Sequence, residues 1–310
     1  MKAIDMQVGK EEFNIKGSYV QVDAVTIDGK ILVITGKSLK TASIKEEIYH
    51  DIKDPGLFIR GLAESGLEPD IFTFTERFPG PKPVFDYYRE WEANSILPVT
   101  TYDNWYNNQI RKVTRHAVRT AAKKGVVIRY RDFDDELVRE IKNIYDETPV
   151  RQGKPFWHYQ KSFEVLKEDL SRDLERSEFI GAYYGDQLIG FIKMLYADKV
   201  IDPVLCISMI EHYDKYPNNA LIARAVRIAE EKNIPYIHYG SWRRETHAKF
   251  LAANGFEKVI CPRYYCPLTS KGKTALRLHL HKGLVGLLPE SVREGLKSAR
   301  ALIFRFRQGS

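Results

Sequence analysis

Cysteine is scarce in this sequence, and long apolar runs are absent. The chain holds three cysteines, Cys206, Cys261 and Cys266, and a count this low and odd excludes a disulfide framework and indicates a reducing compartment. Cys261 and Cys266 have no second such pair, so their spacing does not predict a zinc site. No stretch approaches the roughly 20 apolar residues that cross a bilayer. The first residues lack the apolar core of a signal peptide, so the expected location is the cytoplasm.

Acidic residues are the second shortage. The 48 lysines and arginines outnumber the 41 aspartates and glutamates, which gives a net charge of +7. The run from Gln109 to Arg131 holds no acid. Such an excess suits phosphate-rich partners, among them coenzyme A, a lipid diphosphate, an anionic membrane surface or RNA. Charge alone does not choose among these partners.

The first hundred residues predict a small domain of strands with one helix. Two strand-forming runs flank Asp28-Gly29, a pair that favours a tight hairpin turn. The expected strands are 19–27, 31–35, 41–48, 70–75 and 87–97, and the expected helix is 56–64. We therefore expect an N-terminal α+β domain over residues 1–102.

Residues 103–270 predict a second domain with its own order of elements. A helix is expected at 103–124, and Gly125 follows it where a C-cap belongs. A strand at 126–130 and helices at 134–147 and 163–175 are expected next, followed by three strands at 179–184, 187–196 and 203–210. The domain is expected to end with a helix at 219–232, a strand at 236–239, a helix at 247–253 and a strand at 259–265. Residues 271–310 form a basic tail with a last helix expected at 290–304.

This order resembles the GNAT acyltransferase fold, and three phrases strengthen the likeness. "FIGAYYGDQLIGFIKM" looks like the central GNAT hairpin, and "KFLAANGFEKV" looks like the segment before the final strand. "WYNNQIRKVTRHAVRTAAKKGVVIR" is similar to the arginine-rich helix of FemAB-like proteins. The resemblance implies an α+β fold, an α/β sandwich with a mixed, mostly antiparallel sheet flanked by helices. It makes residues 1–102 a smaller, shortened GNAT-like domain.

The activity that the resemblance implies is that of an N-acyltransferase. The acyl group would pass from acetyl-CoA or another acyl-CoA to an amine acceptor, small or lipid-linked, such as an amino sugar or a cell-envelope precursor. No metal is expected. Two other functions stay open: a FemAB-like transferase that takes its aminoacyl group from tRNA, and a GNAT-derived module that binds without catalysing. The sequence does not indicate an oligomeric state.

The expected donor site follows from the family's diphosphate loop. GNAT proteins bind the diphosphate with backbone amides at the start of a helix, where the first N–H groups are unpaired. The resemblance places Lys215 where Gln or Arg is usual and Asn218 in place of a glycine, because Asn tolerates a left-handed backbone. The expected donor-binding residues are Lys215, Asn218, Asn219 and Ala220. A plain Asn helix cap explains the same residues.

The catalytic residues expected from the resemblance lie beside that loop. Two strands are expected to part near residue 211, where Glu211 or His212 would take the proton of the amine, directly or through water. Leu251 stands roughly where the family has a tyrosine that acts as general acid. Tyr239 is the expected substitute, with Tyr236 and Tyr213 as alternatives. A solvated strand end and a packed core tyrosine are the alternatives.

Two groups of residues are candidates for binding substrates. Arg111, Arg115 and Arg119 recur every four residues on one helix face, which suits phosphate or tRNA; a solvated basic face is the alternative. The second group would line the acceptor pocket or pack under a loop, and comprises Arg151, Trp157, His158 and Trp242. The tail 271–310 predicts peripheral contact with the inner face of the membrane, or packing against the protein.

Overall fold

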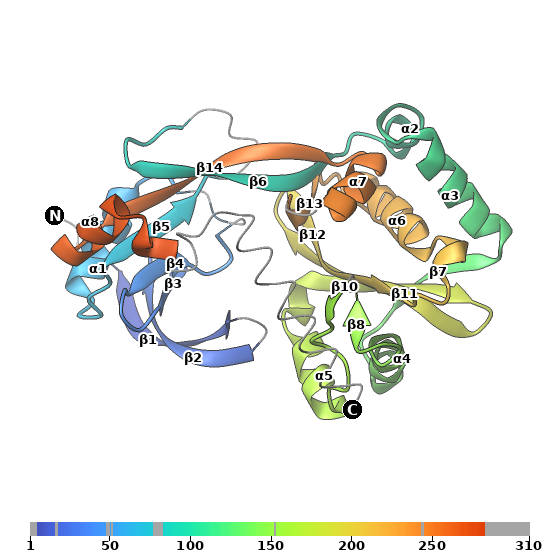
Figure 1. The fold of residues 1–310 in the computed structure, drawn as a ribbon, viewed down its shortest axis with the longest axis horizontal. Helices are drawn as coiled ribbons and strands as arrows, with labels where there is room; N and C mark the ends of the chain where they lie inside the picture. The colour runs from blue at the N-terminus through green and yellow to red at the C-terminus, as the bar shows by residue number, and fades with distance from the viewer. Residues whose placement is uncertain are drawn as a thin grey trace. The chain divides into compact units, whose positions relative to one another are not determined.

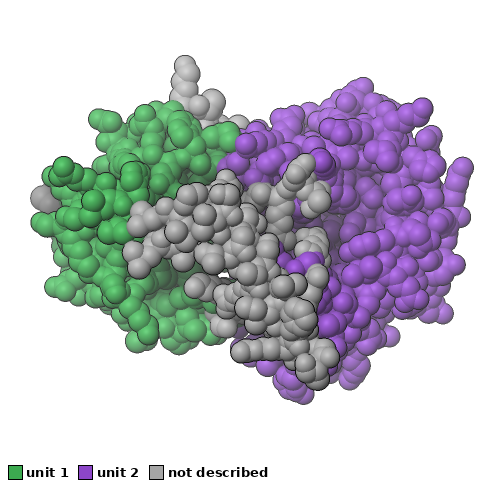
Figure 2. All heavy atoms as spheres, in the orientation of Figure 1, with its two compact units in different colours: residues 1–92, 260–310 green, residues 93–259 purple. Residues whose placement is uncertain are grey.

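The structure is a computed structural model that describes residues 5–15, 18–47, 50, 52–76, 83–151, 153–242 and 245–282. The chain folds into two compact units, residues 1–92 with 260–310 (unit 1) and residues 93–259 (unit 2), which Figure 2 draws in different colours. The chain leaves unit 1 within strand β6 (Tyr88–Pro98) and returns within β14 (Glu257–Pro267). These boundaries differ from the domains expected at 1–102, 103–270 and 271–310, because the end of β14 pairs with β5 (Ile71–Thr75) of unit 1.

Unit 1 is a sheet with strand order β1-β2-β3-β4-β5-β14 and helices on both faces (Figure 1). Its other strands are β1 (Met6–Ile15), β2 (Ser18–Ile27), β3 (Lys30–Thr35) and β4 (Thr41–Ile44). Phe72 and Phe74 of β5 pack with helix α1 (Pro55–Glu64), whereas Ile71 packs with helix α8 (Ser270–Arg277). Successive residues of a strand point to opposite faces, so α1 and α8 cover opposite faces of this sheet.

The strands of unit 2 pair in the order β6-β13-β12-β11-β10-β7. Its strands are β7 (Val126–Arg131), β10 (Ser177–Tyr184), β11 (Gln187–Ala197), β12 (Val200–Ser208) and β13 (Tyr236–Ser241), with part of β6. Its main helices are α3 (Lys112–Lys123), α4 (Asp135–Tyr145), α5 (Phe163–Ser171), α6 (Pro217–Glu231) and α7 (Glu245–Ala253).

Two hydrophobic cores lie on opposite faces of the unit 2 sheet. Ile192 of β11 belongs to the core that includes α3, α6 and α7, and its neighbour Phe191 belongs to the core that includes α4 and α5. Figure 1 shows α3 beside α6, and α4 beside α5. Two short strands, β8 (Val150–Arg151) and β9 (Lys154–Pro155), form a separate hairpin after α4.

The predicted fold class is confirmed, and so are most predicted elements. Pairs β4–β5 and β12–β13 are parallel, and the other pairs described within each unit are antiparallel. The hairpin between β2 and β3 turns at Asp28 and Gly29, both with positive φ, as the sequence predicts. Strand β1 and helix α8 were not predicted, and the helix expected at 290–304 lies outside the described residues.

The prediction of one continuous helix at 103–124 is wrong, because the helix is interrupted before residue 112. A short helix α2 (Tyr102–Asn104) runs into a π-helical turn (Trp105–Gln109), and α3 starts only at Lys112. Trp105 is fully buried and its indole Nε1 donates to the carbonyl of Asn254 at 2.9 Å. The buried Trp105 ring fixes the turn before α3. The spacing of apolar residues in the sequence does not predict this contact.

Candidate active site

Strands β12 and β13 separate shortly after they meet. Their parallel pairing joins Val200 to Tyr236 and Ile201 to Ile237, and in the described chain no later residues of the two strands pair. Beyond this point β12 stays bonded to β11 as far as Ser208, while β13 stays bonded to β6. The separation predicted near residue 211 therefore begins earlier, just after Ile201, because each strand is held by its other neighbour.

Cys206 of β12 and Tyr239 of β13 meet across this separation. Both side chains pack against the core of unit 2, and burial raises the pKa of the Cys206 thiol to about 11, although its interaction with the Tyr239 phenol acts in the opposite direction. Burial, followed by the nearby Cys206 and Asp202, raises the pKa of Tyr239 well above its usual value. Both groups therefore keep their protons at neutral pH. A neutral thiol is a poor nucleophile, whereas a protonated phenol can donate to an oxygen or sulfur atom.

A polar pair lies at the start of the same separation. His238 Nδ1 is 3.2 Å from Asp202 Oδ2, and His238 Nε2 is 3.4 Å from Asn94 Oδ1. His238 is buried, with 5% of its surface exposed. Sequence reasoning missed this pair, because its members are 36 residues apart and become neighbours only through the parallel pairing of two strands. The sequence signal that could have revealed the pair is the presence of Asp202 and His238 within largely apolar strands.

Helix α6 begins beside Cys206, whose sulfur lies 4.0 Å from Oδ1 of Asn218 in the first turn of the helix. Tyr216 precedes the helix in the left-handed conformation, with φ 55°, and Pro217 is the first helical residue. The left-handed position expected at Asn218 is therefore occupied by Tyr216. Among the described residues no side chain caps the start of α6, and an uncapped start carries the partial positive charge that binds anions.

Three of the predicted donor residues have other contacts. The ammonium of Lys215 lies 3.2 Å from Asp214, and Asp214 also pairs with Lys124 at 2.9 Å. Asn219 Nδ2 donates to Asn254 Oδ1 at 3.0 Å, which ties α6 to the residue that follows α7. The backbone N–H of Ala220 donates to the Tyr216 carbonyl. Asn218 is the predicted donor residue that contacts Cys206.

Glu211 and His212 lie in the turn that follows β12. The backbone N–H of Glu211 donates to Oε1 of Glu147 at 2.9 Å. His212 is buried, and its Nε2 is 3.3 Å from Oε1 of Gln187 at the start of β11. No contact among the described residues joins either of them to Cys206 or Tyr239.

The three predicted arginines have different surroundings. The Arg115 guanidinium donates to three carbonyl oxygens of the preceding turn, those of Tyr106, Asn107 and Ile110. Arg111 is the N-cap residue of α3, and its side chain, like that of Arg119, is exposed. Arg115 therefore closes the end of the π-helical turn, and the exposed basic face of α3 carries Arg111 and Arg119.

Arg151 and His158 are both enclosed by protein. The Arg151 guanidinium donates to the Ser208 carbonyl at 2.7 Å and pairs with Glu147 at 2.8 Å, so it fixes the end of β12. The His158 ring centre is 4.2 Å from that of Tyr145. Burial lowers the pKa of His158 to about 3, so its ring is neutral at physiological pH.

The two predicted tryptophans differ in exposure. Trp157 is 54% exposed and its ring covers that of His158, with centres 3.5 Å apart. Trp242 packs against the core of unit 2, and its backbone N–H donates to the Ala93 carbonyl at 2.8 Å. Trp157 therefore presents an open aromatic surface, whereas Trp242 extends the core beyond β13. Leu251, which stands in the place expected for a tyrosine, is fully buried in the same core.

No protein-family model and no curated protein sequence matches the chain, but solved structures do. FemX superimposes with a TM-score of 0.57 at 11% identity, over 88% of this chain and 90% of FemX. The C-terminal domain of a putative lysylphosphatidylglycerol synthetase from Agrobacterium fabrum gives 0.53 at 10% identity, over 81% of this chain and 84% of that domain. L-PGS from Bacillus licheniformis also gives 0.53 at 10% identity, over 76% of this chain and 80% of that protein.

The chain therefore shares the fold of FemX and of these two synthetase structures. The matched shares of the chain exceed unit 2 alone, so the likeness includes both units. At 10–11% identity this structural likeness establishes the fold alone. In the part of the chain that the structure describes, no helix is both long and apolar enough to cross a membrane, and no three His, Cys, Asp or Glu side chains are grouped to hold a metal ion.

Proposed function

We propose that the chain is an N-acyltransferase that moves an acyl group from an acyl-CoA to an amine at the separation of β12 and β13. The observation that carries this proposal is the position of Cys206. Its thiol interacts with the protonated Tyr239 and lies 4.0 Å from Oδ1 of Asn218 in the first turn of α6. The helix start would bind the diphosphate of the donor, and Tyr239 would supply the proton that the departing sulfur needs.

The reaction is a direct transfer. The amine nitrogen forms a bond with the carbonyl carbon and the C–S bond breaks. The Tyr239 hydroxyl protonates the sulfur, and the proton that the nitrogen loses restores the phenol. Burial makes the Cys206 thiol a poor nucleophile, which favours direct transfer over an acyl-enzyme. The acceptor is an amine such as that of an amino sugar or cell-envelope precursor, and the exposed ring of Trp157 offers a surface on which a sugar can stack.

The test uses the full chain, acetyl-CoA and a panel of amino sugars, with release of the coenzyme A thiol as the readout. Tyr239→Phe is expected to lower kcat by about a hundredfold, the low end for a general acid, and to leave the Kd for acetyl-CoA unchanged. Asn218→Asp places a negative charge at the helix start and is expected to weaken acetyl-CoA binding about tenfold. Tyr236→Phe, a matched change in the same strand, is the control. Absence of acetyl-CoA binding, or equal turnover by Tyr239→Phe and the control, would refute the proposal.

A second candidate donor is aminoacyl-tRNA, and the exposed face of α3 favours it. Arg111, Lys112, Arg119 and Lys123 are all exposed there, and the segment contains no acid. Binding to tRNA through this face would weaken with salt. Arg119→Glu should reduce tRNA binding about tenfold, while the exposed Lys199→Glu should not. Equal losses for both variants would indicate general charge attraction and exclude α3 as a tRNA site.

A further inference from the structure

Unit 1 contains a pocket of about 690 Å³. Its described lining comes from the turn Gly36–Leu39, from the first part of α8, and from Leu280 and His281. The volume is in the range of small-molecule sites. None of these residues takes part in the reaction proposed above, so the pocket requires a separate explanation.

Asp70 ties two walls of this pocket together. Its Oδ2 accepts from the backbone N–H of Lys40 at 2.9 Å, just after the turn, and from the Lys271 ammonium at 3.1 Å. Its Oδ1 accepts from Thr269, the N-cap residue of α8, at 2.8 Å. Burial favours the protonated form of Asp70, but these hydrogen bonds prevail and lower its pKa. Asp70 therefore joins the turn to the start of α8.

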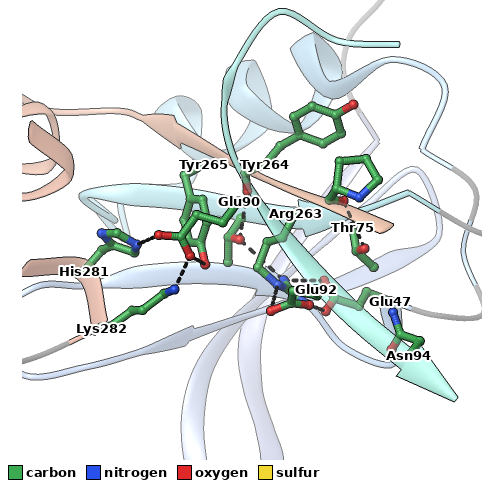
Figure 3. Close-up of polar contacts among 12 residues, drawn as sticks. Glu47, Thr75, Glu90, Glu92, Asn94, Arg263, Tyr264, Tyr265, His281 and Lys282 are labelled. Atoms are coloured by element: carbon green, nitrogen blue, oxygen red, sulfur yellow. Dashed lines mark hydrogen bonds and ion pairs between the residues drawn. The ribbon is translucent and has the colours of Figure 1, made fainter. Parts of the chain in front are cut away.

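His281 supplies a buried polar group with an unused nitrogen. Figure 3 shows Glu90 between His281 and Lys282, and His281 Nε2 is 3.0 Å from Glu90 Oε1. The Tyr265 ring packs edge-on against the imidazole, with centres 4.7 Å apart. The side chain is 2% exposed, and its Nδ1 has no hydrogen-bond partner among the described residues. A buried nitrogen without a hydrogen-bond partner is unfavourable, and a ligand that bonds to it removes this cost.

The rest of the lining is partly cationic and partly apolar. Lys37 is exposed, and Lys271 carries its charge beside Asp70. Ser38, Ser270 and Thr274 add hydroxyl groups, while Leu39, Ala275 and Leu280 provide apolar surface. A lysine binds phosphate as a point charge, and serine and threonine hydroxyls add hydrogen bonds. The apolar side chains would instead contact a hydrocarbon part of the same ligand.

We propose that this pocket binds a phosphate-bearing amphiphile, with its phosphate near Lys37 and His281 Nδ1 and its apolar part against Leu39 and Leu280. Nε2 of His281 faces the Glu90 carboxylate and donates to it, so the neutral ring leaves Nδ1 as an acceptor. Burial lowers the pKa of His281, although Glu90 acts in the opposite direction. The hydrogen bond at Nδ1 therefore uses the proton of a monoanionic phosphate, which a monoester keeps below a pKa near 6.

The experiment is calorimetric titration of the full chain with octyl phosphate, inorganic phosphate and octanol, in separate runs. Octyl phosphate is expected to bind saturably and more tightly than either half alone. Lys37→Ala is expected to weaken it about tenfold, whereas Lys273→Ala, an exposed lysine of α8 outside the pocket, should leave it unchanged. His281→Gln keeps a donor for Glu90 but removes Nδ1, so it is expected to weaken the binding of octyl phosphate. His281→Asn places a polar group near the Nδ1 position and should therefore bind octyl phosphate more tightly than His281→Gln does.

Three results would overturn the proposal: no saturable binding of octyl phosphate, equal affinity for inorganic phosphate, or equal losses from Lys37→Ala and Lys273→Ala. Vesicles of phosphatidylcholine with phosphatidic acid identify the source of the ligand. Binding to them that octyl phosphate displaces supports a membrane lipid, and octyl phosphate binding without vesicle binding supports a soluble ligand. None of these measurements depends on acyl transfer, so either proposal can fail without the other.

Discussion

Lys193 is a buried cation whose replacement should change how stability depends on pH. It lies in β11 with 4% of its surface exposed. Its ammonium donates to the Leu170 carbonyl at 2.9 Å and to the Arg172 carbonyl. Burial lowers the pKa of Lys193 from 10.5 to about 8, although Asp173 and Glu175 act in the opposite direction. The charged form is therefore less favourable in the folded protein than in the unfolded chain.

The sign and the size of the effect follow from this pKa. Between about pH 8 and 10.5 the unfolded chain binds more protons at this lysine than the folded protein does, so the free energy of unfolding rises with pH. Above pH 10.5 the lysine is neutral in both states, and below about pH 8 its full cost is present. At about 1.4 kcal/mol per pKa unit, the fall from 10.5 to about 8 corresponds to about 3 kcal/mol.

The assay is urea unfolding at a series of pH values, followed by tryptophan fluorescence. Trp105, Trp157 and Trp242 lie in unit 2, the unit that contains Lys193. Relative to the unchanged protein, Lys193→Met should lose about 3 kcal/mol of stability as the pH rises through this window. The exposed Lys199→Met is the control and should show no such trend. Parallel pH curves for Lys193→Met and the unchanged protein would refute the reasoning.

Two further predictions concern packing. Arg263 pairs with Glu47 and, at 2.9 Å, with Glu92. Arg263→Met should lower the free energy of unfolding, measured in urea, by about 1–3 kcal/mol because it leaves the half-buried Glu47 carboxylate without its partner. Adding Glu47→Gln should recover part of this loss, and no recovery would show that the pair does not contribute. A Cβ on Gly190 would lie 2.8 Å from the Cβ of Ser208, so Gly190→Ala should cost about 1–3 kcal/mol and lower Tm, unless β11 and β12 can move apart.

Local sequence signals predicted elements well where short-range chemistry decides them. Asp28-Gly29 provides the left-handed backbone of a hairpin turn, and Gly185 has the positive φ of the turn between β10 and β11. The helix predicted at 103–124 failed at Trp105, because the partner of its indole is Asn254, distant in sequence. Periodicity carries no information about such a partner.

The candidate site was predicted in part. Asn218 and Tyr239 were both expected at the donor and catalytic positions, and the fold brings them to the same thiol, that of Cys206. Whether they act in catalysis stays a prediction. His238 and Asp202 were not found, because their proximity depends on which strands pair and for how long.

The sequence by itself determined the order of strands and helices, the two tight turns and the basic character of α3, because each depends on neighbouring residues. Only the tertiary structure decided where β12 and β13 part and which arginine closes a helix end. It also decided that His281 is buried beside a pocket, with a nitrogen that has no partner in the described part of the chain. These features depend on contacts between distant segments. Their free energies depend on burial, which a linear sequence does not specify.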